Sequence, residues 1–448
     1  MELPVSNLES LDKAIAAQLR ADYIYMYPPR QAYRPLEDFS EDSLPAMMSR
    51  SIQRDKRLNL YVHIPFCRQI CGFCNLYTTT VRSHDVFVDY IAAVESQAVL
   101  YRDTVGDGYS IPTVYFGGGT PTILPVEVLA GLMAALRELW PNWEVAAEIA
   151  VEVDPQTVDL SSLSALRDVG FNRVNLGLQS RSASELKIIG RRYGPDEQAE
   201  RVREAMSVGF GNVCVDLIYG LPGQSQETWE SSVVECIELY PQTICCYPLT
   251  LRPFTGFARR TIRPASGMSY DMWNFADQAL RASGYFRQSH VRWARDGGGY
   301  KQKELHWGME NLLGLGAGAR SYLWEIDLRS GYSVVDRNGA LTNFLQVRSP
   351  ADYIPKEGFV MNPDERLRKA IVLGILNLDL DGCEALLGFD PMEVFPVEFA
   401  GLCERGYLAV DSGVASLTQT GARYRDLIVQ LFISETVRRR VEEFDYDE

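Results

Sequence analysis

One stretch decides the fold of this chain, Tyr61-Val-His-Ile-Pro-Phe-Cys67-Arg-Gln-Ile-Cys71-Gly-Phe-Cys74. It places three cysteines in a Cys-x3-Cys-x2-Cys pattern directly after a short apolar segment. Thiolates are the usual protein ligands of iron–sulfur clusters. Because the next cysteine is Cys214, a four-iron cluster held here would keep one iron without a protein thiolate. Such an iron can bind a small molecule, as the open position of a catalytic metal site does.

Two other interpretations of these cysteines stay open from their spacing alone. A structural zinc site needs a fourth Cys or His at finger-like spacing, and neither His63 upstream nor His84 downstream has it. A group of buried thiols without metal would not need this spacing. A disulfide is disfavoured because the N-terminus does not read as a secretory signal, and nine scattered cysteines suit a reducing cytoplasm, the expected location.

The stretch resembles the cysteine motif of the radical S-adenosylmethionine (SAM) superfamily. Within that superfamily it is similar to the branch of oxygen-independent coproporphyrinogen III oxidases, their haem-chaperone relatives and the class C radical SAM methyltransferases. The resemblance implies a [4Fe-4S] cluster on Cys67, Cys71 and Cys74, whose open iron is chelated by the amino and carboxylate groups of SAM. It also implies an electron donor such as flavodoxin or ferredoxin. One electron then cleaves SAM to a 5′-deoxyadenosyl radical, which abstracts hydrogen from the substrate.

Composition and charge bound the class of protein. The 448 residues are enough for two or three domains, and a hydrophobic content of 46% allows a large core. The net charge of −15 argues against non-specific nucleic-acid binding, which depends on neutralising phosphates. No run of about 18 apolar residues occurs, so we expect no membrane span.

Strands and helices alternate from residue 58 to about residue 264, the pattern of a parallel sheet with crossover helices. The candidate strands are 58–63, 113–116, 148–153, 173–179, 212–219 and 243–249. The candidate helices run near 86–103, 125–139, 195–208, 225–239 and 270–283. These six units predict an α/β fold with a partial (β/α)6 barrel, the fold that the resemblance also implies.

Three successive predicted strands carry polar side chains on one face, whereas parallel strands covered by helices normally read as continuous apolar runs. The positions are Glu148, Glu152, Asp154, Arg173, Asn175, Gln179, Asn212 and Asp216. Edge strands facing water are one explanation, but they fit central strands poorly. The pattern therefore favours a barrel lumen that holds a polar ligand.

Several positions match the residues with which the family binds SAM. They are Tyr61, Phe73, Gly118, Gly119, Thr120, Glu152, Gln179, Arg191 and Asp216. The resemblance implies that the glycine-rich segment with Thr120 contacts the methionyl amino group, that Glu152 binds hydroxyls of SAM and that Phe73 lies near adenine. Arg191 falls where the family pairs an arginine with the SAM carboxylate, although Arg192 is adjacent and the assignment could slip by one. A planar guanidinium suits a carboxylate bidentately.

The chain divides into four expected segments. They are an N-terminal extension at 1–57, the radical SAM partial barrel at 58–265, a barrel completion and substrate cover at 266–362, and a small helical domain at 363–448. The extension begins with an amphipathic helix and continues as a Tyr- and Pro-rich strap, which either packs on the surface or helps to cover the substrate. The last segment has the helix–strand–strand–helix order of a winged helix, although its acidic end disfavours DNA binding.

Three smaller features carry expectations of their own. The glycines of 296–300 predict a flexible loop. Arg320 follows a Gly/Ala-rich segment and is either an anion binder or part of a strand and turn. Cys245 and Cys246 are adjacent in a predicted strand and point to opposite faces, so a mutual bond is strained and both read as small buried residues.

Three reactions compete for the same motif, and no catalytic residue follows from it. Coproporphyrinogen oxidases carry a cysteine where this chain has Leu76, and the haem chaperones carry a His-Asn pair where it has Gln302-Lys303. We therefore expect methyl or methylene transfer to an unactivated carbon of a small aromatic or heteroaromatic substrate, with a second SAM molecule. The alternative is oxidative decarboxylation of coproporphyrinogen III, or haem binding as a chaperone.

Overall fold

The computed structural model describes residues 3–19, 21–36, 43–81, 83–260, 269–331, 336–347, 350–355 and 357–444. They fall into two compact units. The barrel unit comprises residues 35–306 and 310–358, and the terminal unit comprises residues 1–34, 307–309 and 359–448. The segment limits expected from the sequence, at 57, 265 and 362, stay a prediction.

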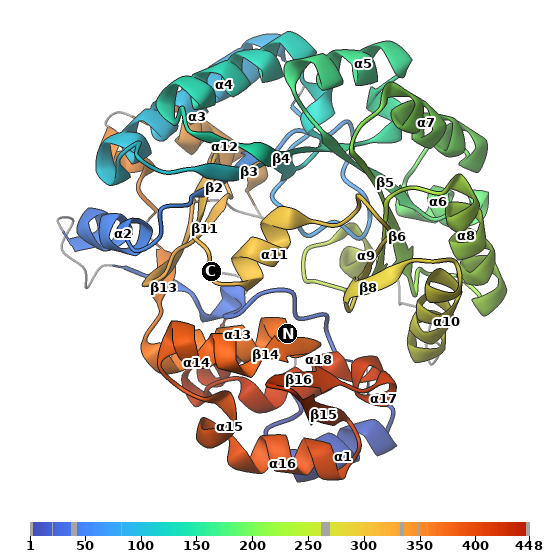
Figure 1. Ribbon diagram of the computed structural model, residues 1–448. Helices are drawn as coiled ribbons and strands as arrows, with labels where there is room; N and C mark the ends of the chain where they lie inside the picture. Colours follow the sequence, from blue (N-terminus) through green and yellow to red (C-terminus); the bar gives the residue numbers. More distant parts are fainter. Residues whose placement is uncertain are drawn as a thin grey trace. The chain divides into compact units, whose positions relative to one another are not determined.

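Six parallel strands form the centre of the barrel unit (Figure 1). They are β2 (Asn59–Ile64), β3 (Ile111–Gly118), β4 (Trp143–Val153), β5 (Arg173–Gln179), β6 (Asn212–Tyr219) and β7 (Thr243–Pro248). Each pairs in parallel with the next strand in the chain. These six strands confirm the predicted partial (β/α)6 barrel.

Short strands extend this sheet on both sides. β10 (Leu312–Leu315) pairs in parallel with β2, and β11 (Arg320–Tyr322) and β12 (Ile326–Arg329) follow it in antiparallel order. On the other side, β9 (Arg292–Ala294) and β8 (Phe286–Ser289) add antiparallel to β7. Strands of three or four residues are too short for a period to be recognised in the sequence.

Helices cover the convex side of the curved sheet, and one short helix lies inside the curve (Figure 1). The covering helices are α3 (His84–Val105), α4 (Val126–Leu139), α5 (Leu160–Val169), α7 (Pro195–Val208), α8 (Gln226–Leu239) and α10 (Ser269–Ala282). In α4 the buried side chains recur at helical spacing, as Leu129, Leu132, Met133 and Leu136 show. Helix α11 (Lys301–Trp307) lies inside the curve; Gln302 Nε2 donates to Leu60 O (2.8 Å) and to Thr113 Oγ1 (3.1 Å).

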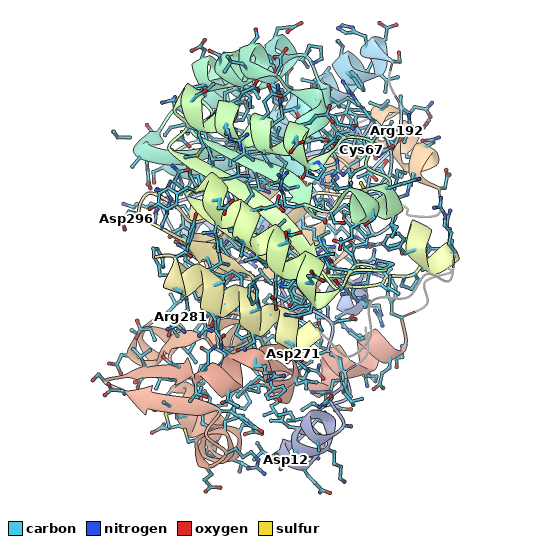
Figure 2. The ribbon with its side chains drawn as sticks, turned by 90° about the vertical axis from the view of Figure 1, so that its right-hand side faces the viewer. Asp12, Cys67, Arg192, Asp271, Arg281 and Asp296 are labelled. Carbon is cyan, nitrogen blue, oxygen red and sulfur yellow. The ribbon has the colours of Figure 1, made fainter. Side chains whose placement is uncertain are left out.

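The glycine-rich loop 296–300 is held at the amino-terminal ends of the strands, so its predicted flexibility was wrong. The carbonyl of Gly299 accepts from Arg173 Nε (3.2 Å) and Asn212 Nδ2 (2.7 Å), while its N–H donates to Thr243 Oγ1 (2.8 Å). Figure 2 shows Asp296 at one end of the barrel unit, and Cys67 and Arg192 at the other. The carboxyl ends of barrel strands are the usual place of an active site.

The terminal unit contains the predicted winged-helix-like domain. Helix α13 (Pro363–Gly374) leads into a three-stranded antiparallel sheet in the order β14-β16-β15. Its strands are β14 (Asn377–Asp379), β15 (Leu408–Asp411) and β16 (Val414–Leu417), with helices α14 (Leu380–Leu387) and α16 (Pro396–Glu404) between the first two. Among the described residues, no helix is long and apolar enough to cross a membrane.

The N-terminal segment packs within the same terminal unit. Helix α1 (Leu8–Ala16) is capped by Asn7, whose side chain accepts from Ser10 N in a capping box. Beyond it, Ile24 N donates to Asp426 Oδ1 (3.1 Å) and the hydroxyl of Tyr27 donates to Glu365 Oε2 (2.5 Å). The aromatic strap is therefore bound to elements that follow it by more than three hundred residues.

Candidate active site

The three cysteines of the opening motif lie on one loop that follows β2. Backbone hydrogen bonds shape the loop: Cys67 N donates to Thr79 O (2.9 Å) and Cys74 N to Cys71 O (3.1 Å). The hydroxyl of Thr120, at the end of β3, donates to Cys67 Sγ over 3.6 Å. The loop is thus fixed from both sides, and its three thiols are free of disulfide bonds.

The electrostatics of these thiols fit a cationic cluster. Burial, with a smaller contribution from the neighbouring cysteines, raises the pKa of Cys67 to about 12 and that of Cys74 to about 11. The pKa of Cys71 is also raised, again mainly by burial. Three such thiols do not ionise together unless a cation joins them, because their thiolates repel. Iron–sulfur clusters take thiolate ligands, so Cys67, Cys71 and Cys74 are the residues that would hold the [4Fe-4S] cluster.

The glycines at the end of β3 allow backbone segments to pass very close to one another. A Cβ on Gly118 would meet the His63 ring at 2.4 Å, and its φ of +109° also favours glycine. A Cβ on Gly119 would meet the carbonyl oxygen of Phe66 at 2.7 Å. The glycine-rich segment therefore lies against the start of the cysteine loop, and its contact with SAM stays a prediction.

A buried carboxyl group, Glu152 on β4, lies beside this backbone. Its oxygens accept from Gly118 N (2.9 Å) and from the hydroxyl of Tyr115 (2.9 Å). Burial raises the pKa of Glu152 to about 7, despite these two donors. The ring of Tyr61 stacks on that of Tyr115 at 6.0 Å between centroids. The structure thus brings the predicted SAM contacts Tyr61, Gly118 and Glu152 into one group.

A second group gathers over the carboxyl end of β5. A Cβ on Gly177 would meet Gln179 Nε2 at 2.6 Å and Arg191 Nη2 at 3.7 Å, so both side chains cross this glycine. Arg191 forms an ion pair with Asp154 at the end of β4. Its segment is bound to the cysteine loop, because Gly72 N donates to Ile189 O (3.3 Å), and its guanidinium lowers the otherwise raised pKa of Cys71. Arg191 Nε is buried without a hydrogen-bond partner among the described residues and can still donate to a ligand.

Asp216 adjoins both groups: it lies opposite Gly177 in the parallel register of β5 and β6, and its charge adds to burial in raising the pKa of Glu152. On β6, Asp216 accepts from Asn175 Nδ2 over 2.5 Å, and burial raises its pKa well above the ordinary value. Phe73 is partly buried against an apolar cluster instead of facing a polar group. The members of that cluster are Leu186, Ile189, Ile218, Leu221, Leu249 and Phe257. The neighbour Arg192 is exposed, so the geometry favours Arg191 as the carboxylate partner.

The structure adds three residues to the site that the sequence did not predict as part of it. Asp154 stood in the polar pattern, but its pairing with Arg191 depends on the turn after β4. Tyr115 shares a strand face with Gly117 and could have been found by the same alternation as the later strands. Tyr300 stacks on Tyr115 at 5.1 Å from the loop before α11, and its place depends on a contact distant in sequence.

Known proteins match the chain over most of its length. Residues 61–235 match the model of the radical SAM superfamily. The heme chaperone HemW of Escherichia coli is 26% identical over 394 residues, 84% of this chain and 98% of the relative. HemW of Synechocystis is 30% identical over 70% of this chain and 77% of the relative. The oxygen-independent coproporphyrinogen III oxidase of E. coli is 28% identical over 83% of this chain and 82% of the relative.

A solved structure extends the similarity to the fold. The coproporphyrinogen III oxidase HemN of E. coli, described as a radical SAM enzyme, superimposes with a TM-score of 0.78 at 25% identity. The match covers 92% of this chain and 96% of that one. These relatives are oxidases and heme chaperones, so they favour the expected alternative over carbon transfer. The chain belongs to the radical SAM superfamily, in the branch of the oxygen-independent coproporphyrinogen III oxidases and the HemW heme chaperones.

Proposed function

We propose that this radical SAM enzyme is an oxidase that oxidatively decarboxylates a porphyrinogen of the coproporphyrinogen III class. One observation carries the SAM-dependent part of the proposal: Arg191, paired with Asp154, lies beside the cysteine loop with a buried Nε that can still donate. A guanidinium at this place suits the carboxylate of SAM.

The substrate side of the proposal rests on the lining of the barrel. The rings of Tyr61, Tyr115 and Tyr300 stack in series, with centroid distances of 6.0 and 5.1 Å. The guanidinium of Arg173 lies over the Tyr300 ring at 4.3 Å, and that of Arg292 at 5.3 Å. Flat rings and cations together suit a ligand built of pyrrole rings and carboxylates.

Three of the four histidines give little support to haem ligation. His63 shares its Nδ1 with the Tyr61 hydroxyl (3.1 Å) and its Nε2 with the Tyr77 carbonyl (2.9 Å). His290 is stacked on Trp273 at 5.0 Å, and His306 lies 4.2 Å from the Tyr322 ring. Each of these imidazoles is buried in the core. Haem binding is therefore the second candidate, supported by the HemW relatives.

When bound, the cluster and SAM supply a 5′-deoxyadenosyl radical that takes hydrogen from a substrate carbon. The chain's own residues would bind and orient these groups: the three cysteines would hold the iron, Arg191 would hold the carboxylate of SAM, and Glu152 and Gly118 would face its polar groups. We also propose an external one-electron donor of the flavodoxin or ferredoxin type. Equilibrium dialysis measures whether one or two SAM molecules bind.

The test is an anaerobic assay of the iron-reconstituted protein with SAM and dithionite. We expect 5′-deoxyadenosine, and with coproporphyrinogen III a product that has lost carbon dioxide. Equilibrium dialysis with labelled SAM counts the bound molecules. Cys71→Ala should abolish both products, whereas Cys236→Ala, a buried cysteine on α8, should not.

The other outcomes separate the alternatives. S-adenosylhomocysteine together with 5′-deoxyadenosine would overturn the oxidase in favour of two-SAM carbon transfer. Tight haem binding without any nucleoside product would establish the chaperone instead. Formation of 5′-deoxyadenosine with an unchanged porphyrinogen would show the radical chemistry but refute this substrate.

A further inference from the structure

Three potential metal ligands outside the cysteine loop converge inside the barrel. Cys214 and Asp216 are two residues apart on β6 and share its concave face. Cys245 on β7 lies opposite Asp216 in the parallel register. Both cysteine residues are buried, with exposed fractions of 0% for Cys214 and 2% for Cys245. The cluster and SAM do not require either thiol.

The distances among these donors match a metal site. Cys214 Sγ lies 3.8 Å from Cys245 Sγ and 3.9 Å from Asp216 Oδ1. All three donor atoms lie within 4.8 Å of one another. Two thiolates bound to zinc at about 2.3 Å and at the tetrahedral angle are separated by roughly 3.8 Å. A disulfide fits less well, because the two cysteines are diagonal neighbours, and diagonal Cα atoms lie about 7–8 Å apart.

The surrounding charges can balance such a site. Arg292 on β9 pairs in register with Cys245, and the charge of Arg173 on β5 reaches both sulfurs. Two thiolates and one carboxylate carry three negative charges against the two positive charges of the ion. The complex therefore keeps a net negative charge, which the guanidinium groups offset. Asn175 holds the other oxygen of Asp216 at 2.5 Å, as outer residues orient metal-bound carboxylates.

We propose that Cys214, Asp216 and Cys245 bind one thiophilic divalent metal ion of the zinc class inside the barrel. Three protein donors leave the fourth tetrahedral position open, which is the arrangement of catalytic rather than structural zinc sites. An oxygen or sulfur atom of a bound molecule can take that position. Asp216, a predicted SAM contact, then belongs to both sites and couples them.

The test compares zinc content in the iron-loaded holoenzyme and its variants. The protein is incubated with zinc and excess metal is removed. We then expect one zinc ion per chain by inductively coupled plasma mass spectrometry. Cys214→Ser and Cys245→Ser should each weaken zinc binding by about tenfold or more, since even outer-shell changes cost 10–100-fold. Cys246→Ser is the matched control, because Cys246 is equally buried in the same strand but points to the opposite face.

A second measurement excludes the cysteine loop as the zinc ligand. In a chain with Cys67, Cys71 and Cys74 replaced by serine, cobalt(II) should still give the thiolate charge-transfer and tetrahedral absorption bands. Adding Cys245→Ser should abolish them. This chain holds no cluster, so the result does not depend on the proposed function. Zinc retained by both single variants, zinc lost equally from Cys246→Ser, or no zinc in any protein would overturn the site.

Discussion

Between about pH 4.5 and pH 7, Glu152 keeps a proton in the folded protein that it would release in the unfolded chain. Its pKa is raised by burial from 4.5 to about 7, so the folded protein binds this proton more tightly than the unfolded chain does. The free energy of unfolding of the ligand-free protein therefore falls as the pH rises through this window, by up to roughly 3 kcal/mol. Glu152→Gln, which cannot ionise, should lack this fall.

The measurement is urea unfolding of both ligand-free proteins, followed by circular dichroism from about pH 4.5 to about pH 8. We expect the wild-type value to decrease relative to the variant up to about pH 7 and then to stay level. A difference that does not change with pH would show that the carboxyl group titrates at its ordinary value.

Arg191 and Arg192 are adjacent arginines that can be compared as partners of the SAM carboxylate. Arg191 is buried and paired with Asp154, whereas Arg192 is exposed. Losing a hydrogen bond to a charged group costs about 1.5–3 kcal/mol, which corresponds to roughly 10–100-fold in affinity. We expect Arg191→Ala to weaken SAM binding by this factor in calorimetry without loss of iron. Arg192→Ala should bind normally; the reverse pattern would shift the assignment by one residue.

At the scale of elements, the packing of the end of β3 against β2 depends on Gly119, because its Cα lies close to the backbone of Ile64 and Phe66. A methyl group on Gly119 would overlap the carbonyl oxygens of Phe66 (2.7 Å) and Ile64 (2.8 Å), which accept from Thr120 N and Gly119 N. Gly119→Ala should therefore force β3 away from β2, cost about 1–3 kcal/mol and reduce iron loading.

Iron content and thermal melting of this variant are compared with those of Gly131→Ala. Gly131 lies within α4 with open space around its Cα, so alanine should stabilise the helix by about 0.5–1 kcal/mol. Equal iron loading in the two variants would show that the close approach at Gly119 is not needed by the cysteine loop.

The elements also show which parts of the fold could be predicted from the sequence. Strands β2 to β7 could be predicted because each alternates or runs apolar over several residues between turn signals. The glycine-rich loop before α11 was misjudged, since glycine signals local freedom, whereas Gly298 is packed so tightly that a Cβ would lie 2.1 Å from Gln242 O. Phe73 lies in an apolar cluster that only the folded chain assembles. Non-local contacts leave no local pattern to recognise.

At the scale of the whole molecule, the terminal unit depends on residues 3–34. Val5, Leu11, Ile24 and Tyr27 are buried there almost completely. Burying each contributes about 1.5–3 kcal/mol, so together they approach the 5–15 kcal/mol that stabilises a typical domain. A chain that starts at residue 35 should therefore have an unfolded terminal unit and a folded barrel unit.

Hydrogen–deuterium exchange distinguishes the two units in one experiment. We expect backbone protection of α13 and of β14–β16 to be lost in the shortened chain, while β2–β7 keep theirs. Adding the separate peptide 3–34 should restore the lost protection. Full protection without the peptide would show that the winged-helix-like domain folds by itself.

The pairing of residues 3–34 with residues 359–444 also sets an order of events on the ribosome. Residues 3–34 leave the exit tunnel 325 residues before residue 359 does. At about 5–20 residues per second, this delay lasts roughly 15–65 s. During this time the strap has buried side chains but no partner, and the complete barrel sequence emerges between the two. Until residues 359–444 emerge, the buried side chains of residues 3–34 are exposed to solvent, a state that we expect chaperones acting early in translation to bind.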